Sequence, residues 1–144
     1  MMKNRKKRNS RMKHKGKQIN ISEEVDIAKA TLEARMMAEE IGFKKIEQYM
    51  ISTATSELAR NIFLYAMKGE ITIKIIERKA KRGVEIVAED YGPGIKDIAQ
   101  AMKGQFSTSG GLGLGLSGAK RLMDEFIVDA QRKRGTKIIV RKWV

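Results

Sequence analysis

The sequence predicts one α/β (α+β) domain, and three observations carry this prediction. Two long segments with helical spacing of apolar residues lie between residues 22 and 65. Apolar and polar residues then alternate over 71–90, as in a β-hairpin, and a glycine-rich segment over 110–118 leads into a third helical pattern and a second hairpin. With 144 residues and 42% hydrophobic content, the chain has material for one core and not for two.

The net charge of +13 is concentrated at the N-terminus. Residues 1–17 contain nine of the 30 Lys and Arg residues and none of the 17 acids, so residues 18–144 carry a net charge of +4. A run of this kind is usually a solvated arm, and less often a contact for nucleic acid or for an acidic partner. No aromatic residue is interleaved with these charges, so base stacking is not indicated. We expect a disordered tail over 1–17, one folded domain over 18–144 and no nucleic-acid partner.

The composition excludes several classes of protein. The chain has no cysteine, which rules out disulfides, thiol catalysis and cysteine zinc sites and fits a reducing cytoplasm. No apolar run approaches the roughly 20 residues of a membrane span, and the basic N-terminal run lacks the apolar core of a secretory signal. His14 is the only histidine, so the folded part has neither a Ser-His-Asp triad nor a phosphoacceptor histidine. We expect a cytoplasmic protein with no membrane contact.

The first part of the domain predicts an edge strand and an amphipathic helix. Residues 18–21 are short and apolar enough for the strand. Ser22 and the acids that follow it favour a helix N-terminus. Apolar residues recur at helical spacing over 27–41, and Gly42 is suited to end the helix.

A second helix is predicted over 44–65, and it carries the first candidate site residues. The buried i, i+4 row is expected to be Ile46, Met50, Ala54, Leu58 and Ile62. Glu57 and Asn61 lie one turn apart beside this row, where burying a carboxylate and an amide is costly without partners. They are either a hydrogen-bonded structural pair, with Arg60 as a further partner, or a functional pair. In the functional case Asn61 binds Mg²⁺ through its amide oxygen and Glu57 positions or deprotonates a nucleophile.

Residues 71–90 predict a hairpin whose second strand ends in an inward-facing acid. The isoleucines of 71–75 alternate with polar residues, and a charged turn is predicted over 79–83. Apolar residues alternate again over 84–88, and continuing their phase places Asp90 on the core side. An acid there needs a partner with hydrogen-bond donors, and the exocyclic amine of adenine is one candidate.

The segment after this strand has the composition of a nucleotide-binding loop. Gly-Pro-Gly at 92–94 breaks the strand and lets the backbone approach a flat ligand. A short helix is predicted over 97–102, and the small residues of 103–113 predict a mobile lid. Five of the nine residues 110–118 are glycine, and they lead into a helix predicted over 114–126. Such a loop presents backbone N–H groups and a positive dipole end to phosphates.

The C-terminal residues predict a second hairpin, with strands over 127–131 and 136–143. Thr136 shares the phase of Ile138 and Val140, so it is expected to face inward with them.

Other nucleotide motifs do not fit. Residues 113–118 match the G-x-G-x-x-G fingerprint of dinucleotide folds, but no strand pattern precedes them as that fold requires. The chain contains no G-x-x-x-x-G-K-[ST] phosphate loop. It also lacks the glycine loop, strand lysine and H-R-D set of the large protein kinase family.

Three ordered motifs instead resemble a family of ATPases. E-L-A-R-N at 57–61, D-Y-G-P-G at 90–94 and G-L-G-L-G-L at 111–116 resemble the N, G1 and G2 boxes of the gyrase, Hsp90, histidine kinase and MutL (GHKL) superfamily. The phrases S-E-L-A-R-N-I, A-E-D-x-G-P-G-I, F-S-T-S-G-G-L-G and K-R-L-M-D-E-F are closer still to the small bacterial serine/threonine kinases of the anti-sigma class, particularly the stressosome switch kinases. The resemblance covers residues 18–144 and leaves out the tail.

This resemblance implies a two-layer sandwich, the Bergerat fold, with helices on one face of a mixed, mostly antiparallel sheet. It implies that Asn61 is the Mg²⁺ ligand, that Glu57 is the catalytic base and that Arg60 assists the phosphate or orients Glu57. Asp90 would accept a hydrogen bond from the adenine amine. The other implied ATP-binding residues are Gly92, Gly94, Ile95, Thr108, Gly111, Gly113, Leu114, Gly115, Leu116 and Thr136.

The implied function is an ATP- and Mg²⁺-dependent serine/threonine protein kinase. Its substrate would be a small STAS-domain protein, either an anti-sigma-factor antagonist or a stressosome scaffold. The alternative is an ATP-dependent binding module that sequesters a sigma factor or activates a PP2C-type phosphatase, with kinase activity secondary. An ATP hydrolase without a protein substrate is less favoured, because no second transducing domain fits in 144 residues. A homodimer is compatible with each of these functions.

Overall fold

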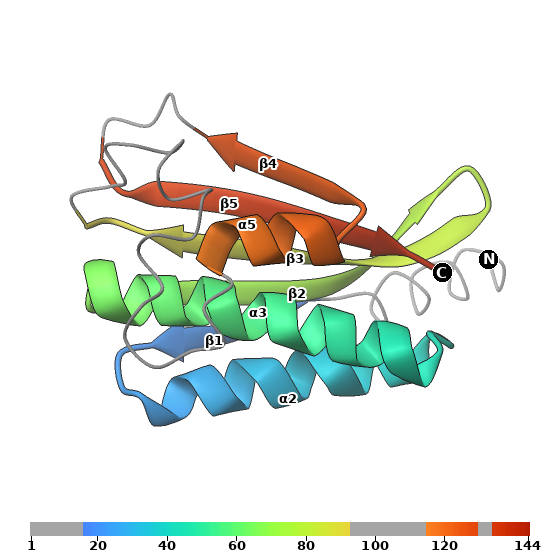
Figure 1. Ribbon diagram of the computed structural model, residues 1–144, viewed down its shortest axis with the longest axis horizontal. Coiled ribbons are helices and arrows are strands. Elements are labelled where there is room, and N and C mark those ends of the chain that lie inside the picture. The colour runs from blue at the N-terminus through green and yellow to red at the C-terminus, as the bar shows by residue number, and fades with distance from the viewer. Residues whose placement is uncertain (1–15, 93–114, 130–133) are drawn as a thin grey trace, which may run out of the picture.

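The computed structural model describes residues 16–92, 115–129 and 134–144 (Figure 1). In chain order the elements are β1 (Lys17–Ile21), α2 (Val25–Glu40), α3 (Lys45–Tyr65), β2 (Gly69–Arg78), β3 (Lys81–Asp90), α5 (Gly115–Leu122), β4 (Glu125–Asp129) and β5 (Thr136–Trp143). The short helix and the lid predicted within 93–114 lie outside the described residues, as do residues 1–15 of the predicted tail.

The strands form one sheet in the order β1-β2-β3-β5-β4, and the described helices cover one of its faces (Figure 1). The predicted two-layer sandwich is therefore confirmed. The prediction of a mixed sheet allowed for a parallel pair, but all four pairings of the described strands are antiparallel. Ile21 pairs with Gly69, Gly69 with Asp90, and Asp90 with Thr136, so one row joins four strands at one end of the sheet.

The core lies between the helices and the sheet face that they cover. Period-2 alternation puts every second residue of β2, β3 and β5 on this face, as predicted. The buried residues of these strands include Ile71, Ile73, Ile75, Val84, Ile86, Ala88, Ile138 and Val140. Asp90 and Thr136 continue the same phase and are each 8% exposed, so both predicted inward orientations are confirmed.

The predicted buried row of α3 is wrong at its N-terminal end. Leu58 and Ile62 are buried, but Ile46 is 62% exposed and Met50 is only partly buried. An i, i+4 row drifts about 40° per step around a helix of 3.6 residues per turn. Over four steps the drift is roughly 160°, so a row that faces the core at Ile62 faces solvent at Ile46. Gln48 takes the inner position in the first turn and donates a hydrogen bond to the Phe43 carbonyl at 3.0 Å.

Two predicted boundaries also differ from the structure. The turn predicted over 79–83 is only Lys79 and Ala80, whose φ angles of 49° and 66° are those of a two-residue hairpin turn that matches the strand twist. The helix predicted over 114–126 ends at Leu122, and Phe126 lies in β4 opposite Val140. No helix among the described residues is both long and apolar enough to cross a membrane.

Candidate functional site

A pocket lies between α3 and the sheet, where β3 ends and β5 begins. It is lined by Leu58, Asn61, Ile62, Tyr65, Ala66, Ala88, Asp90, Thr136 and Ile138. Asn61, Asp90 and Thr136 are site residues predicted from three separate stretches of sequence, and the fold brings them together here. The part bounded by described residues holds about 20 Å³, which is room for one water molecule. A larger ligand therefore needs side chains to move, or walls supplied by residues outside the described ranges.

Asp90 is held at the end of β3 with its side chain toward α3. Its Oδ1 accepts a hydrogen bond from the backbone N–H of Gly92 at 3.0 Å, which fixes the orientation of the carboxylate. Thr136 faces Asp90 across the β3–β5 pair, and directly opposed residues of two paired strands project on the same side. The pair places a carboxylate and a hydroxyl beside the apolar side chains of Leu58, Ile62 and Ile138, a combination typical of small-molecule sites.

Asn61 brings an unsatisfied amide into the same pocket. Its Nδ2 is buried and has no hydrogen-bond partner among the described residues, an arrangement that costs roughly 1–3 kcal/mol unless a ligand supplies the partner. Rotation about the terminal torsion lets the amide present either its oxygen or its nitrogen. No group of three or more His, Cys, Asp or Glu side chains in the described ranges is arranged to hold a metal. The Asn61 amide is therefore the one predicted metal ligand that the described residues place in the pocket, and an amide oxygen is a ligand type that Mg²⁺ accepts.

Glu57 lies one turn before Asn61 and is only 4% exposed. Among the described residues it makes no hydrogen bond and no ion pair, so the structural pair with Asn61 and Arg60 is not observed. Arg60 instead lines a separate groove of about 590 Å³ between α2 and α3, together with Arg35 and Tyr49. Successive helix positions are about 100° apart, which is why Arg60 and Asn61 face different sides.

The predicted phosphate-binding segment is described only at its C-terminal end. α5 begins at Gly115, where φ is 57°, and packs beside α3 on the same face of the sheet (Figure 1). Leu116 is buried at 2% exposure and anchors the first turn of α5. The other implied phosphate and base contacts lie outside the described residues; they are Gly94, Ile95, Thr108, Gly111, Gly113 and Leu114.

The sequence analysis did not single out Lys142, which fixes the other end of α5. Lys142 is 8% exposed, and its Nζ donates to the carbonyl oxygen of Leu122, the last residue of α5, at 2.9 Å. A cation at this end of a helix satisfies an unpaired carbonyl and favours the dipole. Its position was readable from the sequence, because Lys142 continues the inward phase of Thr136, Ile138 and Val140.

Comparisons with known proteins show the family of the chain. The family model described as "Histidine kinase-, DNA gyrase B-, and HSP90-like ATPase" matches residues 47–143. The chain is 51% identical over 126 residues to the serine/threonine-protein kinase RsbT of Bacillus subtilis (strain 168), covering 88% of this chain and 95% of that protein. It is 32% identical over 97 residues to the anti-sigma F factor of Clostridium novyi (strain NT), covering 64% of this chain and 68% of that protein.

A solved structure supports the fold alone. It is the SiaB–SiaC complex from Pseudomonas aeruginosa, which matches with a TM-score of 0.53, 14% identity and 96% of both chains covered. The motif resemblance noted in the sequence is confirmed by the family model and by the two relatives. The chain therefore belongs to the family of histidine kinase-, DNA gyrase B- and HSP90-like ATPases.

Proposed function

We propose that this chain, a serine/threonine protein kinase by its relationship to the Bacillus enzyme, transfers the γ-phosphate of ATP to a hydroxyl of a small STAS-domain protein. We place the kinase domain over 18–144 and the reaction in the cytoplasm. The observation that carries the proposal is the pair Glu57 and Asn61: two buried polar side chains, one turn apart, without described partners, beside the pocket that holds Asp90.

Asp90 and Thr136 are proposed to bind the adenine base. The Asp90 carboxylate accepts a hydrogen bond from the exocyclic amine, while its Oδ1 stays on the Gly92 N–H. A carboxylate held by a backbone donor is already oriented when the ligand arrives, so less entropy is lost on binding. Ile62 and Ile138 supply apolar walls for the ring.

The phosphates are proposed to lie between Asn61 and the N-terminus of α5. The first backbone N–H groups of a helix have no partner within the helix and favour an anion. Asn61 would hold Mg²⁺, which neutralises phosphate charge during transfer when it is bound. The residues of the G-L-G-L-G-L motif before α5 would add further backbone donors.

Glu57 is proposed as the base. The acceptor oxygen forms a bond to the γ-phosphorus, the bond from that phosphorus to the bridging oxygen of ADP breaks, and Glu57 takes the hydroxyl proton. Phosphoryl transfer depends mainly on positioning and charge stabilisation, and a correctly placed base adds a further factor. Arg60 lines the α2–α3 groove and not the base pocket. We therefore assign Arg60 a role outside the base pocket, in orienting the partner protein or the phosphate.

A second candidate function is supported by the similarity to an anti-sigma F factor. In this case the ATP-bound chain sequesters a sigma factor or activates a PP2C-type phosphatase, and transfer is secondary. A homodimer is compatible with both functions.

The deciding experiment incubates the purified full chain with Mg·ATP and a purified STAS-domain protein, followed by mass spectrometry. We expect phosphoserine or phosphothreonine on the partner, and none when its acceptor residue is replaced by alanine. A stable ATP-dependent complex with a sigma factor or a phosphatase, and no phosphate on any STAS protein, would favour the second candidate.

A further inference from the structure

Two glycines flank Asp90 across the sheet, and neither belongs to the motifs discussed above. Gly69 is the first residue of β2 and pairs directly with Asp90. Gly135 precedes β5, whose first residue, Thr136, pairs with Asp90 from the other side. The strand end that carries the carboxylate therefore has a glycine directly opposite it on β2 and a glycine next to its partner Thr136 on the β5 side.

Gly135 leaves no room for a side chain beside the backbone of Asp90. Its φ is 78°, in the region that non-glycine residues rarely adopt. A Cβ placed there would overlap the carbonyl oxygen of Asp90 and lie 2.7 Å from its carbonyl carbon and 2.8 Å from the Cα of Tyr91. These are backbone atoms, so the overlap is relieved only if the end of β3 moves.

Gly69 is equally crowded from the opposite strand. A Cβ on Gly69 would meet the carbonyl oxygen of Glu89 and lie 2.9 Å from both the Asp90 Cβ and the Ile62 Cγ2. Ile62 is a wall of the same pocket. A methyl group at this position therefore pushes on the carboxylate-bearing residue and on the pocket wall together.

We propose that Gly69 and Gly135 are positioning residues for Asp90, and that they set the selectivity of the pocket for a purine bearing an exocyclic amine. This inference rests on the proposed role of Asp90 in binding adenine. Hydrogen bonds weaken steeply with distance and angle. A backbone shift large enough to accommodate either Cβ moves the carboxylate away from the Gly92 N–H, now at 3.0 Å, and away from the amine of the base.

The chain offers a matched control at the opposite end of the same strand pair. A Cβ on Gly83 would lie 2.5 Å from the Lys142 carbonyl oxygen and 2.7 Å from the Trp143 ring, so Gly83 is about as crowded as Gly69. Gly83 is seven residues before Asp90 along β3, or about 23 Å at 3.3 Å per residue. Gly83→Ala should therefore disturb the sheet without disturbing the pocket, and it is matched most closely to Gly69→Ala, since neither glycine has a positive φ.

The experiment compares Gly69→Ala, Gly135→Ala and Gly83→Ala in the full chain. Calorimetry measures Kd for Mg·ATP and for the Mg complex of purine riboside triphosphate, which lacks the 6-amino group. We expect the first two variants to lose about tenfold in ATP affinity and most of the preference for ATP over the analogue. Gly83→Ala should lower the melting temperature and keep the preference. The amide NMR resonance of Gly92 should shift in the first two variants and not in the third.

Equal loss of affinity for both nucleotides, with an unmoved Gly92 resonance, would overturn the proposal. Asp90→Asn separates this outcome from failure of the proposed function: if that variant keeps the preference for ATP, the role of Asp90 itself is wrong. If Gly135→Ala does not fold, Gly135→Asn repeats the test, because asparagine tolerates a positive φ but still carries the Cβ. Gly69→Ala, at an ordinary φ, tests the opposite side independently.

Discussion

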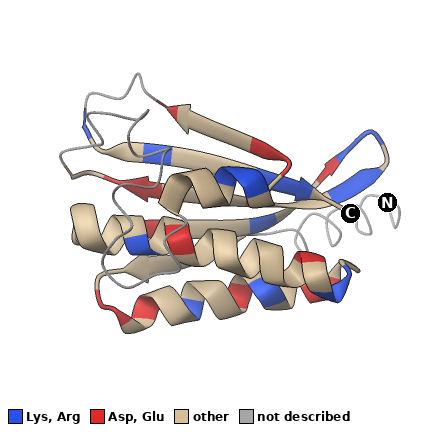
Figure 2. Cartoon of the chain, in the orientation of Figure 1, with Lys and Arg blue, Asp and Glu red and all other residues tan. Residues whose placement is uncertain are grey.

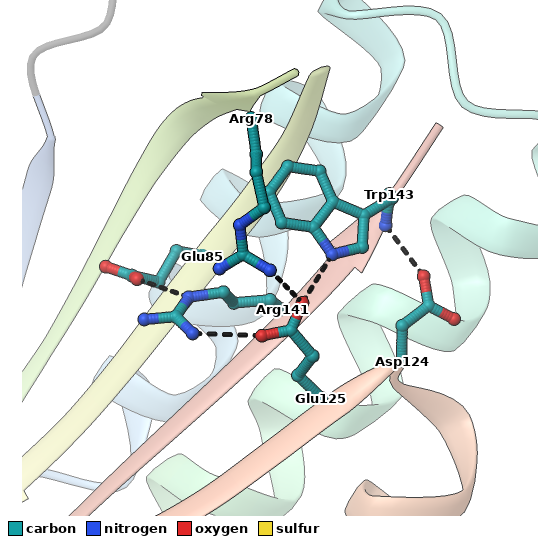
Figure 3. A network of polar contacts seen from close by, with 6 residues as sticks. All are labelled: Arg78, Glu85, Asp124, Glu125, Arg141 and Trp143. Carbon is teal, nitrogen blue, oxygen red and sulfur yellow. Dashed lines mark hydrogen bonds and ion pairs between the residues drawn. The ribbon is translucent and has the colours of Figure 1, made fainter. Parts of the chain in front are cut away.

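Strands β3 and β5 run side by side along the sheet, and their two ends hold polar side chains in opposite ways. Toward the end where β3 begins, a continuous network connects Arg78, Glu85, Glu125, Arg141 and Trp143 (Figure 3). Arg141 donates to Glu85 at 2.7 Å and to Glu125 at 3.0 Å. Glu125 also accepts from the Trp143 indole at 2.7 Å and from Arg78 at 2.9 Å.

The charges in this network stabilise each other. Hydrogen bonds from Trp143 and Arg141, together with the charge of Arg78, hold the pKa of Glu125 below its usual value. The hydrogen bond to Glu85 in turn raises the pKa of Arg141. Arg78 also lies over the Trp143 ring at 4.7 Å. These groups have partners within the chain, so they join strands and do not call for a ligand.

The Asp90 end of the strands differs in its unsatisfied groups and not in its charge. Figure 2 shows acidic and basic residues over both helices and strands, so charge alone does not identify a site. What distinguishes this end is the pocket that Asn61 and Asp90 line, where the buried Asn61 Nδ2 has no described partner and the buried Glu57 lies one turn before it. Buried polar groups are normally satisfied. Gln48 Oε1, near the N-terminus of α3, is also buried without a described partner, so the Asn61 amide indicates a ligand only together with the pocket and with Asp90 beside it. The predictions below test this contrast.

The largest effect is expected from Glu57→Ala. Removing a general base should slow phosphate transfer to the partner by about 10²–10⁴-fold. The Kd for ATP should stay within about twofold, because Glu57 does not line the base pocket. Transfer is measured from initial rates by mass spectrometry, and Kd by calorimetry. Glu33→Ala, on α2, is the control, and a normal transfer rate in Glu57→Ala would contradict the assignment.

Asp90→Asn should raise the Kd for ATP by about 10–100-fold. The amide oxygen of the asparagine would keep the hydrogen bond from the Gly92 N–H, which leaves its NH₂ group facing the adenine amine. Two donors then oppose each other. Calorimetry with Mg·ATP measures the loss, with melting temperature as the control for folding. An unchanged Kd would refute the proposed base pocket.

The inward orientation of Asp90 and Thr136 could be predicted because its signals are local. The alternation of 84–88 placed Asp90 on the core side, and the phase of Ile138 and Val140 placed Thr136 there. A turn of helix likewise put Glu57 and Asn61 on one side of α3. These inferences need only the periods of a strand and a helix.

The rest depends on how distant segments pair. The Glu85–Arg141–Glu125 network joins three strands, and its register follows from the order β3-β5-β4, which no local pattern specifies. The crowding at Gly69 has the same origin, since it arises from a neighbour twenty-one positions along the chain. The exposed Ile46 shows a different error. The i, i+4 spacing keeps residues on one face of a helix only over a turn or two, and the prediction extended it over the whole of α3.

Glu125→Gln should lower the free energy of unfolding by about 1 kcal/mol at pH 7 and leave the Kd for ATP unchanged. Because the pKa of Glu125 is lowered in the folded chain, its stabilisation is present above the ordinary value of 4.5 and is lost as the pH falls through the folded value. Urea denaturation at pH 7 and pH 3 should show the difference from the parent shrinking at acid pH. Glu39→Gln, at an exposed position of α2, is the control. A weakened ATP affinity in Glu125→Gln would contradict the contrast between the two ends.

The smallest effect is expected from Asp26→Asn, which tests whether position alone makes a site. Asp26 lies in the first turn of α2, at the same end of the sheet as Asp90 but outside the pocket. Its Oδ2 accepts from the backbone N–H groups of Ser22 at 3.0 Å and Glu23 at 2.9 Å. These bonds, with Lys29 adding, lower the pKa of Asp26. Its stabilisation is therefore present at neutral pH and fades as the pH falls through the lowered value.

The Asp26→Asn variant keeps an acceptor oxygen and loses only the charge. Its urea midpoint at pH 7 should therefore fall by less than that of Glu125→Gln. The difference between the midpoints of Asp26→Asn and the parent should disappear in acid. The Kd for ATP should equal that of the parent and of the exposed control Glu23→Gln. If Asp26→Asn instead weakened ATP binding as Asp90→Asn does, a carboxylate outside the pocket would matter to the ligand as much as one that lines it. The pocket at the end of β3 would then not locate the site.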